Sequence, residues 1–266
     1  MKKLLLLTTC IANSDNLSDL DRMLVSYSAP RDEFLHIILI QGDVSNYSPR
    51  IDRIKEKAEV IFVESIVSLS KARNILYEHS LRNGFFEQAD IVSFPDDDCW
   101  YPEGNLDEIY HLFHHDEKLD MFVCRFSENT KKVERTDKFR PIKISELVSK
   151  CASVTIFCRT RVIDKSEFFD ESLGIGSPNN GGEDLDFAMR SYINSSKVLF
   201  SDCAFVGHLD EKPGMKHRYF RGGLKALRKN SRKHPLFFAF FIRKILVGFY
   251  YVAKYKMPLN MFFSVK

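Results

Sequence analysis

The sequence lacks the glycine-rich loops that bind nucleotides in the commonest α/β proteins. Neither G-x-G-x-x-G nor G-x-x-x-x-G-K occurs in its first half, which argues against a dinucleotide-binding or P-loop protein. The six cysteines include no C-x-x-C pair, so neither a zinc site nor a disulfide framework is indicated, and reduced thiols of a cytosolic protein are expected. There is no internal repeat. The 266 residues, 44% of them apolar, suffice for one sizeable domain and an appendage.

Acidic residues are missing from the end of the chain. Residues 212–266 hold 14 Lys and Arg and no Asp or Glu, whereas the remainder holds 25 basic and 36 acidic residues. We therefore divide the chain into an acidic domain, 1–211, and a basic, aromatic-rich helical tail, 212–266. This asymmetry favours a polyanionic partner for the tail, either a membrane surface or a nucleic acid.

The first half alternates strand and helix patterns. Buried strands are predicted at 4–9, 36–40, 60–63 and 91–94, and helices at 20–27, 51–58 and 68–82. The apolar run at 4–7 is shorter than the roughly 7–15 residues of a secretion signal, so the strand interpretation is preferred. The pattern predicts an α/β fold with a mostly parallel central sheet and helices on both faces.

The second half continues in the same way. A helix is expected at 105–114 and strands at 121–125, 154–158 and 197–200, with a charged surface loop or edge hairpin at 131–143. Residues 168–182 form a glycine- and asparagine-rich loop that leads into acids at a helix start, an arrangement common in active-site lids.

Three consecutive carboxylates follow the strand at 91–94, in the run I-V-S-F-P-D-D-D-C-W-Y-P. Asp96, Asp97 and Asp98 repel one another, and none can be buried without a compensating charge. Ligands of open α/β sheets lie at the carboxyl ends of the strands, and hard divalent cations prefer carboxylate oxygens. The run therefore predicts a cation site, with a solvated acidic turn as the alternative.

Four motifs in this order resemble the GT-A-fold glycosyltransferases of the large family-two group. They are S-L-S-K-A-R-N (68–74), F-P-D-D-D-C-W-Y-P (94–102), G-G-E-D-L-D-F (181–187) and G-H (207–208), to which the basic segment 218–230 is added. The resemblance covers most of the chain. It implies a GT-A, Rossmann-like domain that moves a sugar from a nucleotide-diphosphate donor, as in bacterial polysaccharide synthesis.

The resemblance also implies roles for individual residues. In an inverting transfer, Asp184 would be the general base, with Glu183 beside it, although acids at this place are also favoured by the helix dipole. Asp98 and His208 would bind a divalent metal, Mn²⁺ or Mg²⁺. The donor would be contacted by the remaining candidates, namely Asp43, Lys71, Arg73, Asp96, Asp97 and Arg190.

The segment 236–254 is too apolar for an ordinary surface helix. Arg243 and Lys244 interrupt it, and with helical spacing they lie opposite a face of Phe238, Ile242, Ile245, Leu246, Phe249 and other apolar residues. This pattern is typical of a helix lying in an anionic membrane interface. A hairpin packed back on the domain is the alternative, and nucleic acid is not expected.

The leading hypothesis is therefore an inverting, metal-dependent glycosyltransferase that is cytoplasmic and attached peripherally to the inner face of a bacterial plasma membrane. Its acceptor would be a glycan or lipid-linked glycan, as for capsule or O-antigen. A sugar nucleotidyltransferase is one alternative. A non-catalytic, membrane-associated protein that binds sugar nucleotides or glycans is another.

Overall fold

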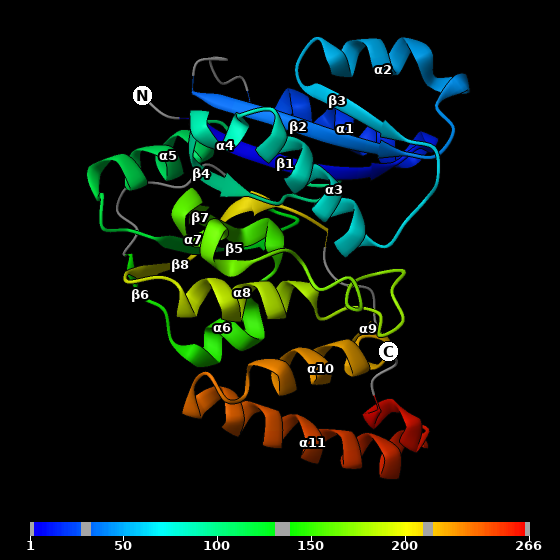
Figure 1. Ribbon diagram of the computed structural model, residues 1–266, viewed down its shortest axis with the longest axis vertical. Coiled ribbons are helices and arrows are strands. Elements are labelled where there is room, and N and C mark those ends of the chain that lie inside the picture. The colour runs from blue at the N-terminus through cyan, green and yellow to red at the C-terminus, as the bar shows by residue number, and fades with distance from the viewer. Residues whose placement is uncertain (1–2, 28–32, 131–138, 210–214, 264–266) are drawn as a thin grey trace.

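The computed structural model describes residues 3–27, 33–130, 139–209 and 215–263. The first half contains β1 (Lys3–Ile11), α1 (Ser14–Ser26), β2 (Phe34–Gln41), α2 (Ser48–Lys55), β3 (Glu59–Val63), α3 (Leu69–Arg82), α4 (Phe85–Gln88) and β4 (Ala89–Ser93). The second half contains α5 (Asn105–His115), β5 (Met121–Ser127), β6 (Arg140–Pro141), α6 (Ile144–Lys150), β7 (Ile156–Arg159), α7 (Thr160–Ser166), α8 (Glu183–Ile193) and β8 (Val198–Gly207). Figure 1 shows these elements in place.

One sheet runs through the molecule in the order β3-β2-β1-β4-β7-β5-β8-β6. The strands β1 to β4 are mutually parallel, and β5 is parallel to β8. The predicted strand at 154–158 differs in detail, because residues 153–155 form a short 3-10 turn and β7 runs antiparallel to β4 and β5. The predicted α/β fold with a mostly parallel sheet is confirmed.

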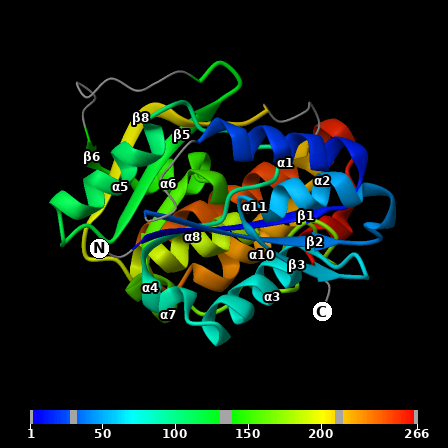
Figure 2. The ribbon, with the colours of Figure 1, turned by 90° about the horizontal axis from the view of Figure 1, so that it is seen from above.

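Both faces of the sheet are covered, as Figure 2 shows. The helices α1, α2 and α5 pack on one face, through residues such as Leu20, Ile54 and Ile109. On the other face lie α3, α7 and α8, through residues such as Leu76 and Phe187. A strand buried on both faces needs apolar side chains throughout, which explains the continuous apolar runs of the sequence.

Some element boundaries differ from the predictions for local reasons. Helix α1 begins at Ser14 rather than near residue 20, because the Asn13 side chain caps it by accepting a hydrogen bond from the Asn16 backbone N–H at 2.9 Å. The short helices α4, α6 and α7 were not predicted. Of the segment 131–143, residues 131–138 lie outside the described part, and β6 is an edge strand antiparallel to β8.

The tail forms α9 (Met215–Arg218), α10 (Phe220–Asn230), α11 (Pro235–Tyr255) and a 3-10 turn, η3 (Leu259–Phe262). In Figure 1, α10 lies beneath α8, and α11 lies beneath α10. Ala226, Leu227 and Phe237 belong to the same buried cluster as α8 residues. The tail therefore shares a core with the α/β part, while the division of the chain at residue 211 stays a prediction.

Helix α11 is the one described helix that is long and apolar enough to cross a membrane by length and composition. Arg243 and Lys244 interrupt the apolar segment, but they do not keep it from meeting this criterion. In the structure one side of α11 packs on α10, and Lys244 lies over the ring of Phe220 at 5.0 Å. The contacts to α10 would be lost if α11 crossed a bilayer.

Candidate active site

The acidic turn after β4 lies at a topological switch point of the sheet. The strand β1 is paired with β2 on one side and β4 on the other, so the chain winds away in opposite directions from the β1–β4 boundary. Asp96 continues the pairing beyond β4 through a bridge to Thr9 at the end of β1. Open α/β sheets form their ligand crevices at such places.

Arg73 connects the two acidic motifs. Its guanidinium, only 2% exposed, donates hydrogen bonds to Asp184 Oδ1 at 2.8 Å, to Asp96 Oδ1 at 2.9 Å and to Ser153 Oγ at 2.7 Å. Burial disfavours its charge, but the two carboxylates outweigh that effect and raise the pKa of Arg73. The structure thus brings together Arg73, Asp96 and Asp184, which the sequence separates by up to 111 residues.

The motif at 68–74 also fixes the glycine-rich loop. Ser70 Oγ donates to the Leu173 carbonyl at 2.7 Å, and the Asn74 amide donates to the Phe169 carbonyl at 3.0 Å while accepting from its N–H at 2.8 Å. Gly174, at φ 98°, allows the close approach, since a Cβ there would lie 2.7 Å from Ser70 Oγ. Ser70, Asn74 and Ser153 are site residues that the sequence analysis did not name, and only their motif position pointed to the first two.

Glu183 and Asp184 begin α8 directly after two glycines. Gly182, at φ 84°, lies against the backbone of α10, where a Cβ would come within 2.3 Å of the Gly222 carbonyl carbon. Glu183 is buried, and burial, followed by the neighbouring charge of Asp184, raises its pKa to about 7. Burial likewise raises the pKa of Asp96, although Arg73 opposes the shift.

His208 lies beside the acidic turn, with Nε2 at 3.2 Å from Asp98 Oδ1 and 3.8 Å from Asp96 Oδ2. Burial opposes its protonation, but the hydrogen bond to Asp98 and the charges of Asp98 and Asp96 raise its pKa to about 9. Ligand atoms of Asp98, Cys99 and His208 lie within 4.8 Å of one another. Burial raises the pKa of Cys99 well above its usual value, so this thiol stays protonated. Asp98 and His208, with Asp96 beside them, make a donor set that fits a hard cation such as Mn²⁺.

The other predicted donor residues are placed less centrally. Asp97 is hydrogen-bonded to the Cys10 thiol. Burial raises the pKa of Asp97 to about 7, although the hydrogen bond to Cys10 opposes this shift. Asp43 follows β2 and accepts a hydrogen bond from the Ser45 N–H at 2.8 Å, while its side chain is exposed. Lys71 is exposed on the first turn of α3.

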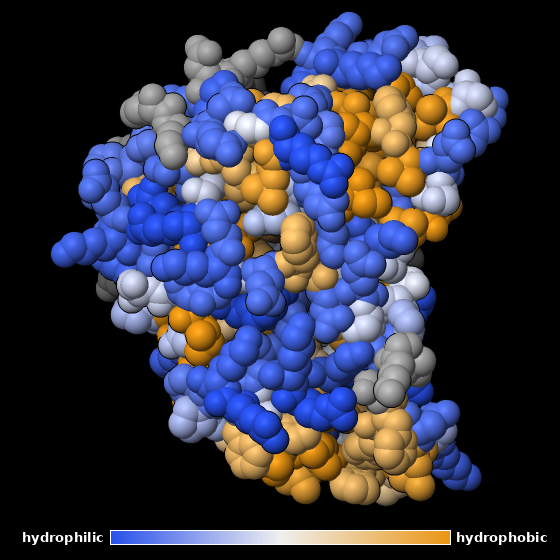
Figure 3. All heavy atoms as spheres, in the orientation of Figure 1, coloured by the Kyte–Doolittle hydropathy of each residue, from blue (hydrophilic) through white to orange (hydrophobic). Residues whose placement is uncertain are grey.

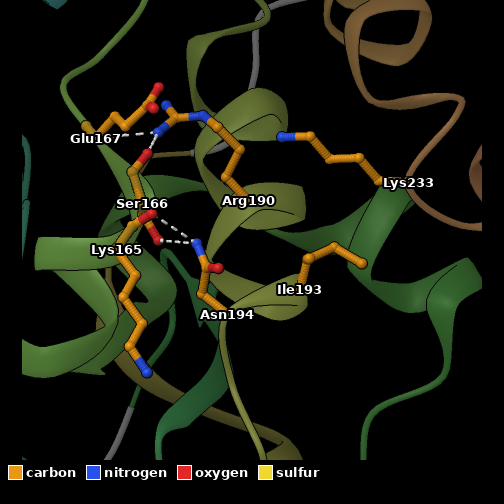
Figure 4. A pocket seen from close by; sticks show the side chains of 7 residues that line it. All are labelled: Lys165, Ser166, Glu167, Arg190, Ile193, Asn194 and Lys233. Atoms are coloured by element: carbon orange, nitrogen blue, oxygen red, sulfur yellow. Dashed lines mark hydrogen bonds between the residues drawn. The ribbon is translucent and has the colours of Figure 1, made fainter.

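Arg190 does not join these residues. Its guanidinium bonds to Asp186 Oδ2 at 2.8 Å and to the carbonyls of Ser166 and Glu167, beside a pocket shown in Figure 4. Asp186 is fully buried and also accepts from the Asn230 amide of α10 at 2.7 Å. Arg190 thus anchors the far end of α8, and we do not include it in the donor site.

The mostly parallel eight-stranded sheet with helices on both faces is the GT-A fold that the motifs predicted. Crystal structures of S. aureus TarS residues 1–349 are similar, alone (TM-score 0.62, 16% identity), with UDP-GlcNAc (0.64, 17%) and with UDP (0.61, 17%). Each match covers 85–86% of this chain but only 65% of that one. At such identity the likeness shows the fold alone. No family model and no curated protein sequence matches.

Proposed function

We propose that this chain is an inverting, metal-dependent glycosyltransferase that uses a nucleotide-diphosphate sugar. The observation that supports it most is the Arg73 guanidinium, which holds Asp96 from the acidic turn and Asp184 from α8 at 2.9 and 2.8 Å. The acidic turn, which would bind the donor diphosphate, and Asp184, which would accept the proton, thus both lie at the Arg73 guanidinium. Two of the similar TarS structures hold UDP-GlcNAc or UDP, so UDP-sugars are the first donors to test.

Asp184 is the proposed base. Arg73 bonds to its Oδ1, so the other carboxylate oxygen can accept the proton of the acceptor hydroxyl. As that hydroxyl oxygen bonds to the anomeric carbon, the bond from this carbon to the diphosphate oxygen breaks and the nucleoside diphosphate leaves. Glu183, with a pKa near 7, lies beside Asp184 as an orienting group or second acceptor.

Asp98 and His208 would hold a divalent cation, with Asp96 beside them. When bound, the cation would neutralise charge on the leaving diphosphate. Asp43, at the carboxyl end of β2, would contact the nucleoside, and the exposed Lys71 would contact the diphosphate. Asp97 supports the turn through Cys10.

The exposed face of α11 favours attachment to an anionic membrane. Figure 3 shows apolar side chains gathered at this end of the molecule, and those left exposed include Phe238, Ile242, Leu246 and Phe249. Arg243 and Lys254 are exposed on the same helix. A helix that exposes both an apolar face and basic side chains is suited to lie in the interface, on the cytoplasmic leaflet, where a lipid-linked glycan acceptor of bacterial surface polysaccharide would be found.

The test is release of nucleoside diphosphate from UDP-sugars by the purified chain, with Mn²⁺ or with chelator. Asp98→Asn and Asp184→Asn should each lose at least about a hundredfold in rate, as expected when a metal ligand or general base is removed. Asp52→Asn, on the exposed side of α2, is the matched control and should retain wild-type activity. Full activity in Asp184→Asn would refute its role as base.

The same assay separates the alternatives. A sugar nucleotidyltransferase would form a nucleotide sugar and pyrophosphate from a nucleoside triphosphate and a sugar phosphate. A non-catalytic binding protein would be stabilised by a UDP-sugar but release no UDP from it.

A further inference from the structure

The acidic turn is held from the side of α1 by Arg22. Its Nη2 donates to the backbone carbonyl of Asp98 at 2.9 Å, although 76 residues separate the two. Its guanidinium carbon lies 4.7 Å from the centroid of the Trp100 ring, and the same group pairs with Asp19 at 3.1 Å. Arg22 therefore contacts both neighbours of Cys99, namely Asp98 and Trp100.

Trp100 in turn is hydrogen-bonded to the end of β8. The Trp100 backbone N–H donates to the Gly207 carbonyl at 3.0 Å, and the Gly207 backbone N–H donates to the Trp100 carbonyl at 2.7 Å. The indole lies directly against Gly207, where a Cβ would come within 2.0 Å of the ring. Only glycine permits this contact, and the next residue is His208.

The two proposed metal-binding side chains therefore come from segments that these contacts lock together. Asp98 follows Asp96 and Asp97, and its own backbone carbonyl is held by Arg22, whereas His208 follows the glycine that Trp100 covers. Three adjacent carboxylates repel one another and would open the turn if nothing opposed them. Ligands are effective when surrounding contacts hold them in place before the ion arrives.

We propose that Arg22, Trp100 and Gly207 form a positioning clasp that holds Asp98 and His208 at the separation needed to share one divalent cation. This inference rests on the proposed function. Arg22 acts through Asp98 and Trp100 and is a positioning residue, not a catalytic one. Its charge and its flat guanidinium both matter, since lysine can supply the charge but neither the stacking nor the same hydrogen-bond geometry.

The chain contains a single tryptophan, Trp100, so its intrinsic fluorescence reports on the clasp without interference. The experiment titrates Mn²⁺ into the full chain and follows this emission, with no sugar nucleotide present. Arg22→Gln should weaken Mn²⁺ binding by about tenfold or more, the effect typical of losing a group that orients a metal ligand. Arg22→Lys should fall between Arg22→Gln and the wild type.

Arg82→Gln is the matched control, because Arg82 is exposed on α3 and pairs only with Glu78 among the described residues. It should bind Mn²⁺ as the wild type does, and thermal denaturation should show both glutamine variants folded. Wild-type Mn²⁺ affinity in Arg22→Gln would overturn the clasp and leave the proposed function standing. A wild-type chain that binds no Mn²⁺ would instead overturn the metal site of the proposed function, and the clasp with it.

Discussion

Replacing Arg73 with methionine tests the bridge at the centre of the site. The change keeps an apolar stem of similar length but leaves Asp96, Asp184 and Ser153 without their shared donor. Breaking a buried ion pair on one side costs about 3–5 kcal/mol. Because the side chains of Asp96 and Asp184 are 34% and 27% exposed, we expect the lower end, about 3 kcal/mol of unfolding free energy.

Thermal denaturation measures this loss directly. A loss of about 3 kcal/mol corresponds to a fall of roughly 6–12 °C in Tm for a chain of this size. The loss should shrink as the pH falls from 7 to 5, because burial raises the pKa of Asp96 and, without Arg73, this carboxylate can take up a proton and no longer repel Asp184. Arg82→Met, at an exposed arginine of the same helix, should change the unfolding free energy by no more than about 0.5 kcal/mol. A decrease below 1 °C in Arg73→Met, or a decrease independent of pH, would refute the bridge.

Two further predictions concern the loop and the tail. The pKa of Asp170 is lowered to about 2, because hydrogen bonds from Ser172 and Lys229 outweigh the opposing effect of burial. The ionised Asp170 carboxylate therefore stabilises the fold fully above about pH 4, and this stabilisation is lost as the pH falls towards 2. The Tm difference between wild type and Asp170→Asn should be larger at pH 5 than at pH 2.5. An equal difference at the two pH values would contradict this prediction. Leu246→Glu, on the exposed face of α11, should reduce binding to phosphatidylglycerol-containing vesicles about tenfold in co-sedimentation, given roughly 1.5–3 kcal/mol for burying a leucine. Val25→Glu, at an exposed apolar residue of α1, is its control, and equal binding by the two variants would count against an α11 interface.

The exposed apolar face of α11 shows how far helical periodicity alone can predict. The spacing of apolar residues identified a helix at 236–254 with Phe238, Ile242, Leu246 and Phe249 on one side, and these four are exposed in the structure. It also placed Ile245 on that side, although Ile245 packs against the Phe220 cluster. Periodicity gives the angle between residues but not which sector of an apolar helix meets its neighbour.

The two arginines predicted to contact the donor, Arg73 and Arg190, show a similar limit of sequence patterns. Arg73 lies in the motif 68–74 and Arg190 lies on the helix that begins at the motif 181–187, yet Arg73 meets Asp96 and Asp184 whereas Arg190 bonds to Asp186 and the end of α7. A helix with acids at its start offers its later arginine several possible partners. In the structure Asp186 also accepts a hydrogen bond from Asn230 of α10, a contact that the sequence pattern does not reveal.

The local features could be predicted from the residue order: buried strands from continuous apolar runs, the acid triplet at a strand end, glycines where the backbone turns, and a basic tail without acids. These follow from interactions between residues near in sequence, so a single chain displays them. The tertiary structure alone decided that β7 runs antiparallel, that Arg73 joins two motifs, and that Arg22 and Trp100 hold Asp98 near His208. Such contacts join residues from about 20 to more than 100 positions apart, and their geometry exists only once the sheet and both helical layers have packed.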